Sequence, residues 1–215
     1  MNYRIFDIET GPVSLDKLQD QMPEFKAPSN YKDEEKIAAY IEEQQSKWIE
    51  KAALDASTGR VIAIGVKDSD GNTVIEEEQF MPEGDLLQWF WGEVTKTHAD
   101  TTWVGFNSNS FDLPFLFRRS LVYGIQPGYS FRESRYWPAR FLDLLEVWAC
   151  NNREQRISLD KMARLLGVGG KNGSGKLFAN LYETDRKSAI EYLKHDLEIT
   201  EAIMIKMQPW IGNSK

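Results

Sequence analysis

The stretch IFDIET, residues 5–10, decides how this sequence is interpreted. Side chains alternate between the two faces of a β-strand, so Asp7 and Glu9 share one face while Phe6 and Ile8 share the other. Two neighbouring carboxylates repel each other, and burying them costs free energy unless a positive charge compensates. A strand with one face in water would show the same alternation, and so would a strand whose acids bind a divalent cation. The rest of the chain must decide between these two interpretations.

Length and composition predict one globular domain over residues 1–215, with a helical insertion at about 12–56. Apolar residues make up 41% of the chain and charged residues 27%, as in soluble globular proteins. Cys150 is the only cysteine, which excludes an intramolecular disulfide and a cysteine-based zinc site and favours a reducing, cytoplasmic location. The sequence shows no signal peptide and no long apolar run, so we expect no contact with a membrane.

The net charge of -7 argues against a protein that coats nucleic acid along its whole surface. The charge is unevenly distributed, however. Residues 1–100 contain 10 Lys and Arg against 21 Asp and Glu, a net charge of -11, whereas residues 101–215 contain 16 against 12, a net charge of +4. The second half is therefore the better candidate for contact with a polyanion.

Apolar periodicity predicts an α/β fold with a mixed sheet. The turn with Asp70 and Gly71 indicates a hairpin, and Ser158 is a candidate helix cap. We expect residues 12–32 to be irregular and residues 136–144 to be mixed extended chain. The expected strands are 3–8, 60–67, 73–80 and 101–106, and the expected helices are 33–55, 84–98, 112–123, 158–167 and 185–207.

A second acidic motif lies in GFNSNSFD, residues 105–112. Asp112 follows a predicted strand and opens a predicted helix, where the helix dipole favours a carboxylate. An acid at a helix start is common, so this position alone is ordinary. Asn107 and Phe111 add an amide and an aromatic ring, which suit contacts to a nucleotide.

A third motif lies in the last predicted helix. Tyr192 and Asp196 are four residues apart and therefore share one helix face. Alone, such a pair is usually a surface feature. The neighbouring stripe is apolar and predicts a buried face, formed by Ala189, Leu193, Leu197, Thr200 and Met204.

The three motifs F-D-x-E-T, N-x-x-x-F-D and Y-x-x-x-D, in this order, resemble the DEDD superfamily of 3′-5′ exonucleases in its tyrosine subclass. These DnaQ-like enzymes have an RNase H-like fold, which implies a mixed β-sheet flanked by helices. The closer resemblance is to the predicted exonucleases related to the proofreading domain of family B DNA polymerases. It extends over almost the whole chain, including the insertion after the first strand and the segment RISLDKMARLLGV, residues 156–168.

The resemblance implies a role for each motif residue. The metal ligands would be Asp7, Glu9, Asp112 and Asp196, and Tyr192 would orient the attacking water. The histidine subclass has H-x-x-x-x-D, but Glu191 occupies that position here, and His195 projects away from the Asp196 face. Candidate substrate contacts are Thr10, Asn107, Phe111 and Lys171.

The chemistry of phosphodiester hydrolysis suits these residue types. It requires an activated water and compensation of the charge on the leaving 3′ oxygen, which two divalent cations can provide. Carboxylate oxygens prefer Mg²⁺ or Mn²⁺, whereas zinc sites usually contain Cys or His. A tyrosine hydroxyl, with an ordinary pKa of about 10, is suited to hydrogen bonding rather than to proton abstraction at neutral pH.

Other features have competing interpretations. GGKNGSGKL, residues 169–177, matches G-x-x-x-x-G-K, but Leu177 replaces the hydroxyl residue of a nucleotide-binding loop. We expect a glycine loop in which Lys171 and Lys176 contact phosphate. Asp143 is a candidate supporting residue for the site. Several arginines and aromatic residues could line a strand-entry groove or merely cover the surface: Arg118, Arg119, Arg132, Arg135, Arg140, Phe131, Tyr136 and Trp137.

The sequence therefore predicts a metal-dependent 3′-5′ exonuclease that shortens single-stranded DNA and releases nucleoside 5′-monophosphates, alone or with a partner protein. The preference for DNA follows from the resemblance to proofreading domains. Two alternatives remain open. One is a 3′-5′ exoribonuclease, because the same acids serve both polymers. The other is a non-catalytic nucleic-acid-binding module on the same fold, against which the complete acid set argues.

Overall fold

A five-stranded mixed sheet organises the chain, with strand order β3-β2-β1-β4-β5. The computed structural model describes residues 2–128, 140–150, 152–170 and 178–211. Strand β1 is central, since it pairs antiparallel with β2 and parallel with β4. The strands are β1 (Tyr3–Pro12), β2 (Gly59–Asp68), β3 (Thr73–Glu77), β4 (Thr102–Gly105) and β5 (Phe141–Asp143).

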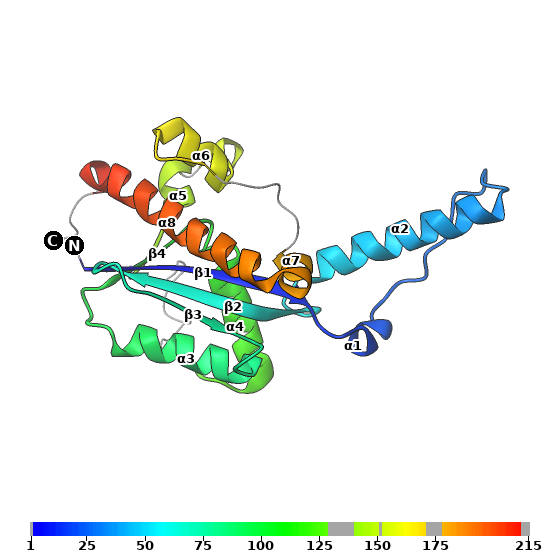
Figure 1. Cartoon of the computed structure of the whole chain (residues 1–215), viewed down its shortest axis with the longest axis horizontal. Helices are drawn as coiled ribbons and strands as arrows, with labels where there is room; N and C mark the ends of the chain where they lie inside the picture. Colours follow the sequence, from blue (N-terminus) through cyan, green and yellow to red (C-terminus); the bar gives the residue numbers. More distant parts are fainter. Residues whose placement is uncertain (1, 129–139, 151, 171–177, 212–215) are drawn as a thin grey trace.

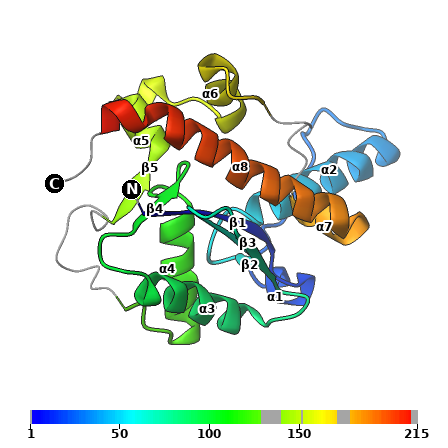
Figure 2. The ribbon, with the colours of Figure 1, turned by 60° about the vertical axis from the view of Figure 1, so that its left-hand side comes forward.

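Helices cover both faces of this sheet (Figures 1 and 2). Phe6 and Ile8 of β1 pack into a core with α3 and α4, whereas Ile5 packs into a second core with α5, α6 and α8. The described helices are α1 (Leu15–Gln19), α2 (Glu34–Ala52), α3 (Glu83–Lys96), α4 (Asp112–Tyr123), α5 (Leu144–Ala149), α6 (Leu159–Leu166), α7 (Phe178–Thr184) and α8 (Arg186–Ile211), with a 3₁₀ turn at Arg153–Gln155. The predicted α/β class with a mixed sheet is confirmed.

Most predicted elements are present with small shifts at their ends. The predicted helix 112–123 coincides with α4, and Ser158 caps α6 by accepting a hydrogen bond from the Lys161 N–H at 3.2 Å. The prediction for residues 12–32 was wrong at 15–19, which form α1, and β1 extends to Pro12. Helices α5 and α7 were not predicted, because segments of six and seven residues are too short for a clear helical period.

The segment after the first strand, where an insertion is expected, forms an arm, which we define as residues 20–51. Helix α2 extends away from the sheet, and an irregular segment runs beside it (Figure 1). Asp33 caps α2 by accepting hydrogen bonds from the Glu35 and Lys36 N–H groups. Of the residues of α2, only Ala52 is buried, so the arm contributes little to the core.

Among the described residues, no helix combines the length and the apolar character needed to cross a membrane. The longest helix, α8, lies across the sheet (Figure 2). The apolar stripe predicted for this helix is buried at all five positions: Ala189, Leu193, Leu197, Thr200 and Met204. Helix α8 is therefore a core element of the fold.

Candidate active site

The two acids of β1 lie on the face of the sheet that α8 covers. Ile5, two residues before Asp7, packs against α8, whereas Phe6 and Ile8 face α3 and α4. Asp7 and Glu9 are half-buried, so this face is neither the open solvated surface nor the closed core. The structure therefore shows the alternation predicted from IFDIET, with Asp7 and Glu9 on one face of β1 and Phe6 and Ile8 on the other.

Helix α8 approaches this part of the sheet closely because β2 carries a glycine opposite Asp7. Gly65 is paired with Asp7 across the β1–β2 ladder. A Cβ atom at Gly65 would lie 2.8 Å from Leu197 Cδ1, which is closer than Cβ atoms approach other atoms. The absent side chain leaves room for Leu193 and Leu197 of α8 against β2, on the helix that also carries Asp196.

Three carboxylates meet as a result. Asp7, Glu9 and Asp196 each offer an oxygen, and these oxygens all lie within 4.8 Å of one another. Asp196 is buried, and the two β1 acids are half-buried. Such a cluster of acids could hold a metal ion, because carboxylate oxygens are the ligands that hard divalent cations prefer.

The fourth predicted acid, Asp112, comes from the other side of β1. It is the first residue of α4 and only 3% exposed, and its Oδ1 accepts a hydrogen bond from the Ile8 N–H at 3.1 Å. Its side chain is also hydrogen-bonded to Asp7. Burial raises the pKa of Asp112 to about 7, against the lowering effect of its hydrogen bonds. Asp112 is therefore in contact with the cluster through Asp7.

The loop between β4 and α4 is held in place by Asp143, the last residue of β5. The Asp143 carboxylate accepts hydrogen bonds from the backbone N–H groups of Asn107 at 2.9 Å and Asn109 at 3.0 Å. It also caps α5 through the Leu145 and Glu146 N–H groups. Burial raises the pKa of Asp143 despite these hydrogen bonds. This carboxylate fixes the backbone path that leads to Asp112.

Other predicted site residues surround the acids. Tyr192 is half-buried, one helical turn before Asp196, and packs against the cluster that includes Phe178. Thr10 is buried beside a register shift between Glu9 and Thr10 in β1. Phe111 precedes Asp112 and contacts Phe115 with ring centroids 5.6 Å apart.

Asn107 adopts a left-handed backbone conformation with φ of 61°. This conformation is uncommon outside glycine but tolerated by asparagine. Several predicted contacts lie outside the described residues, namely Lys171, Lys176, Phe131, Arg132, Arg135, Tyr136 and Trp137. His195 is half-buried, with Nε2 3.2 Å from the Gly170 carbonyl oxygen.

Two of the arginines that could line a strand-entry groove or cover the surface bind groups of the protein itself. Arg119 is buried, and its guanidinium donates two hydrogen bonds to Glu83, at 2.8 and 2.7 Å. Arg140 donates to the carbonyls of Thr97, His98 and Thr101, at the amino end of β4 and away from the loop at its carboxyl end. Arg119 is buried and so does not cover the surface, and sequence spacing did not reveal the distant partners of either arginine. Arg118 is exposed.

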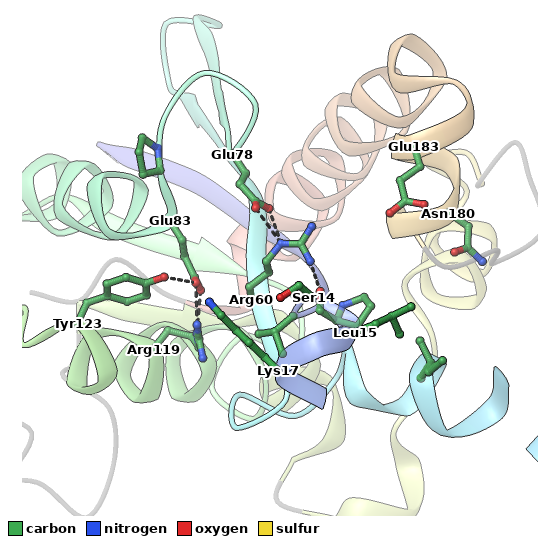
Figure 3. Close-up of a pocket in the computed structure, with 14 residues that line it drawn as sticks. Ser14, Leu15, Lys17, Arg60, Glu78, Glu83, Arg119, Tyr123, Asn180 and Glu183 are labelled. Carbon is green, nitrogen blue, oxygen red and sulfur yellow. Dashed lines mark hydrogen bonds and ion pairs between the residues drawn. The ribbon is translucent and has the colours of Figure 1, made fainter. Parts of the chain in front are cut away.

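A cavity of about 730 Å³ lies beyond the end of β1, where these ion pairs meet solvent (Figure 3). Arg119 and Tyr123 contact Glu83 on one side, and Arg60 contacts Glu78 and the Pro12 carbonyl on the other. None of the four predicted acids lines this cavity. The cavity is therefore distinct from the acid cluster, and both of its arginines are paired with carboxylates.

Arg156 was not singled out from the sequence, yet it contacts the loop before Asp112. One of its nitrogens donates to Asn107 Oδ1 at 3.1 Å and to Ser110 Oγ at 2.9 Å. A signal was available in the segment RISLDKMARLLGV, which starts at this arginine. Nothing in the local pattern, however, predicts its contact with a loop 46 residues earlier.

The sheet order and the flanking helices define an α/β fold, and the three convergent acids mark a candidate metal-binding site on it. The chain resembles the family B DNA polymerase from the hyperthermophilic archaeon Pyrobaculum calidifontis, with a TM-score of 0.66 and 19% identity over 97% of this chain. This chain spans 25% of the length of that polymerase, and the likeness concerns the fold alone. A search of curated proteins finds no match.

Residues 53–213 match the model of a family described as predicted 3′-5′ exonuclease related to the exonuclease domain of PolB. The chain belongs to this family, which confirms the predicted enzyme class, 3′-5′ exonuclease. The match begins after the arm, so Asp7 and Glu9 lie outside it. The structure nevertheless brings both residues to Asp196, which lies inside the match.

Proposed function

We propose that this chain is a metal-dependent 3′-5′ exonuclease of the tyrosine subclass that shortens single-stranded DNA and releases nucleoside 5′-monophosphates. The observation that carries the proposal is the convergence of Asp7, Glu9 and Asp196, from the two ends of the chain, with oxygens within 4.8 Å of one another. Like charges at this distance are unfavourable without a compensating cation. Residues 1–215 would form one exonuclease domain that carries the arm as an insertion.

The donor set fits divalent cations of the Mg²⁺ or Mn²⁺ type. Every donor in the cluster is a carboxylate oxygen, and Asp112 adds a fourth carboxyl group through its contact with Asp7. Within the described residues, this cluster contains neither histidine nor cysteine, which zinc would favour. We propose that Asp7, Glu9, Asp112 and Asp196 hold two ions.

When bound, two such ions would lower the pKa of the attacking water and offset charge on the leaving 3′ oxygen. The residues of the chain would hold the attacking water and the metal ligands in place. Tyr192, one turn from Asp196, would orient the water by a hydrogen bond from or to its hydroxyl. Asp112, fixed by the Ile8 N–H and by the α4 start, would hold its carboxylate in a constant place.

The substrate would lie over the acid cluster and the loop before α4. Asn107 offers an amide and Phe111 a half-exposed ring on which a base can stack. Thr10 lies next to Glu9 in β1, and Lys171 would contact phosphate. The preference for DNA rests on the relation of the family to the exonuclease domain of PolB and on the fold of a DNA polymerase.

The test is digestion of 5′-labelled single-stranded DNA and RNA oligonucleotides with Mg²⁺, with Mn²⁺ or with EDTA. We expect DNA to shorten from its 3′ end with either metal and to remain intact in EDTA. Faster digestion of RNA than of DNA would instead support the alternative function, a 3′-5′ exoribonuclease. Tight binding without cleavage in either metal would support the non-catalytic module instead.

The matched variants are Asp7→Ala in the cluster and Asp70→Ala in the β2–β3 turn. Asp70 is exposed and lies in the turn between β2 and β3, so its loss removes one charge without touching the cluster. Asp7→Ala should abolish cleavage and leave the circular dichroism spectrum unchanged, while Asp70→Ala should cleave normally. Cleavage by Asp7→Ala at the wild-type rate would refute the metal assignment.

A further inference from the structure

Arg156 is a cation at the edge of the candidate active site, and no acidic partner for it is found in the described part of the chain. Its side chain donates hydrogen bonds to two neutral oxygens, Asn107 Oδ1 and Ser110 Oγ. Within residues 2–128, 140–150, 152–170 and 178–211, no carboxylate lies within 4.0 Å of its nitrogens. Its side chain is only half-buried, so its charge remains accessible from solvent.

The acids near this loop are already engaged by other donors. Glu146 accepts a hydrogen bond from Asn109 Nδ2 at 2.7 Å. Asp143 accepts four backbone N–H groups and is 2% exposed. Arg119, by contrast, is neutralised by Glu83. Among the residues that the structure describes, no carboxylate therefore forms an ion pair with Arg156.

The topology places this charge beside the acids. β1 and β4 are parallel, and Ile5 is paired with Val104. Asp7 lies two residues after Ile5, and Asn107 lies three residues after Val104, so both lie toward the same edge of the sheet. Strands in a sheet lie about 4.8 Å apart, and ligands of open α/β sheets bind beyond the carboxyl ends of parallel strands. Arg156, held by Asn107, is anchored at this edge.

We propose that Arg156 binds a backbone phosphate of the nucleic acid strand near its 3′ end, and that Asn107 and Ser110 hold the guanidinium ready for it. This inference rests on the proposed function. An arginine presents five N–H donors in a planar fork, so the nitrogen bound to Asn107 and Ser110 leaves other donors for phosphate oxygens. A partly desolvated phosphate contact would also draw the strand across the loop toward Asp112 and Asp7.

The test measures binding in EDTA, which prevents cleavage, with a short 5′-labelled oligothymidylate. In successive oligonucleotides, one phosphate after another from the 3′ end is replaced by an uncharged methylphosphonate. We expect one position at which wild-type binding weakens about tenfold whereas Arg156→Gln shows no further loss. The same variant should flatten the plot of log affinity against log salt by about 0.7, the value for one contact to a single strand.

The matched control is Arg164→Gln on α6. Arg164 donates to both Asp160 carboxylate oxygens at 3.0 Å, so its charge is already paired. This control removes the same formal charge and should retain the wild-type profile. Arg156→Lys should retain the salt dependence and part of the affinity, because it keeps the charge but loses the fork.

If wild type and Arg156→Gln lose the same affinity at every methylphosphonate position, the inference is wrong and Arg156 only stabilises the loop. Digestion by the wild type in Mg²⁺ is measured in parallel. If the wild type digests DNA but no methylphosphonate position weakens its binding more than that of Arg156→Gln, only the phosphate contact is refuted. A wild type that fails to digest DNA would refute the proposed function independently of the binding data.

Discussion

The Asp112 carboxyl group links the sheet to the helix that begins with it, and its environment makes stability depend on pH. In the metal-free protein, burial raises its pKa to about 7, whereas an unfolded aspartate titrates at about 3.9. As the pH rises, the unfolded chain loses this proton first, and the folded protein keeps it longer. The free energy of unfolding should therefore fall between about pH 4 and about pH 7 and become constant above that range.

Asp112→Asn should remove the larger part of this pH dependence, because the amide resembles the neutral acid at every pH. Thermal unfolding in EDTA, followed by circular dichroism, measures the effect. Asp143, whose pKa is also raised by burial, should leave a smaller slope of the same sign. Asp70→Ala provides the control and should keep the wild-type slope. An unchanged slope in Asp112→Asn would contradict the assignment to this carboxyl group.

The proposed role of the Tyr192 hydroxyl in orienting the attacking water can be tested by removing that hydroxyl. Tyr192→Phe removes the hydroxyl but keeps the ring that packs near Phe178. We expect the turnover number to fall by about 10- to 100-fold, with little change in thermal stability, because a misplaced water reduces the rate without unfolding the site. Single-turnover digestion with Mg²⁺ measures this rate. Tyr182→Phe, on α7 and bonded to Glu77, is a matched tyrosine control for rate. Equal rates for wild type and Tyr192→Phe would exclude the water-positioning role.

At the scale of elements, one carboxylate joins β5, α5 and the loop before α4. Asp143→Ala would leave the Asn107 and Asn109 N–H groups without their acceptor and would remove the cap of α5. A buried unsatisfied N–H group costs about 1–3 kcal/mol and a lost cap about 0.5–2 kcal/mol. Both N–H groups are only partly buried, so the low end of these costs applies, and we expect the free energy of unfolding to fall by about 2–4 kcal/mol, measured by urea denaturation.

Asp33→Ala is the control for this prediction, because Asp33 also caps a helix with its carboxylate. Its helix, α2, lies in the exposed arm, so we expect less than about 1 kcal/mol of change. Asp143→Asn keeps one acceptor oxygen and should fall between the two. Equal losses for Asp143→Ala and Asp33→Ala would show that the loop does not depend on Asp143.

At the scale of the whole molecule, we expect the arm to contribute little to the stability of the sheet. Of the residues of α2, only Ala52 is buried. Replacing residues 21–47 by a flexible Gly-Ser linker should leave the sheet, α8 and cleavage intact, because closing a loop of different length changes stability by less than about 1 kcal/mol. Urea denaturation and oligonucleotide digestion measure both effects. Loss of folding in this deletion would place the arm among the elements that stabilise the core.

The sequence by itself determined those features that depend on local period. The alternation in IFDIET fixed the shared face of Asp7 and Glu9, and the helix pattern fixed the first residue of α4 and the four-residue spacing of Tyr192 and Asp196. These features depend only on the period of a strand, which is two residues, and on the period of a helix, which is 3.6 residues per turn. Most of the strands and the start of α4 at Asp112 were accordingly predictable.

Only the tertiary structure decided which distant groups meet. Asp196 reaches Asp7 because α8 packs over Gly65, and Asp143 holds a loop 36 residues earlier. Arg119 and Arg156 look alike in the sequence, yet one is buried against Glu83 and the other faces neutral oxygens. The physical reason is that burial and charge pairing depend on side chains far apart in sequence, which no local pattern specifies.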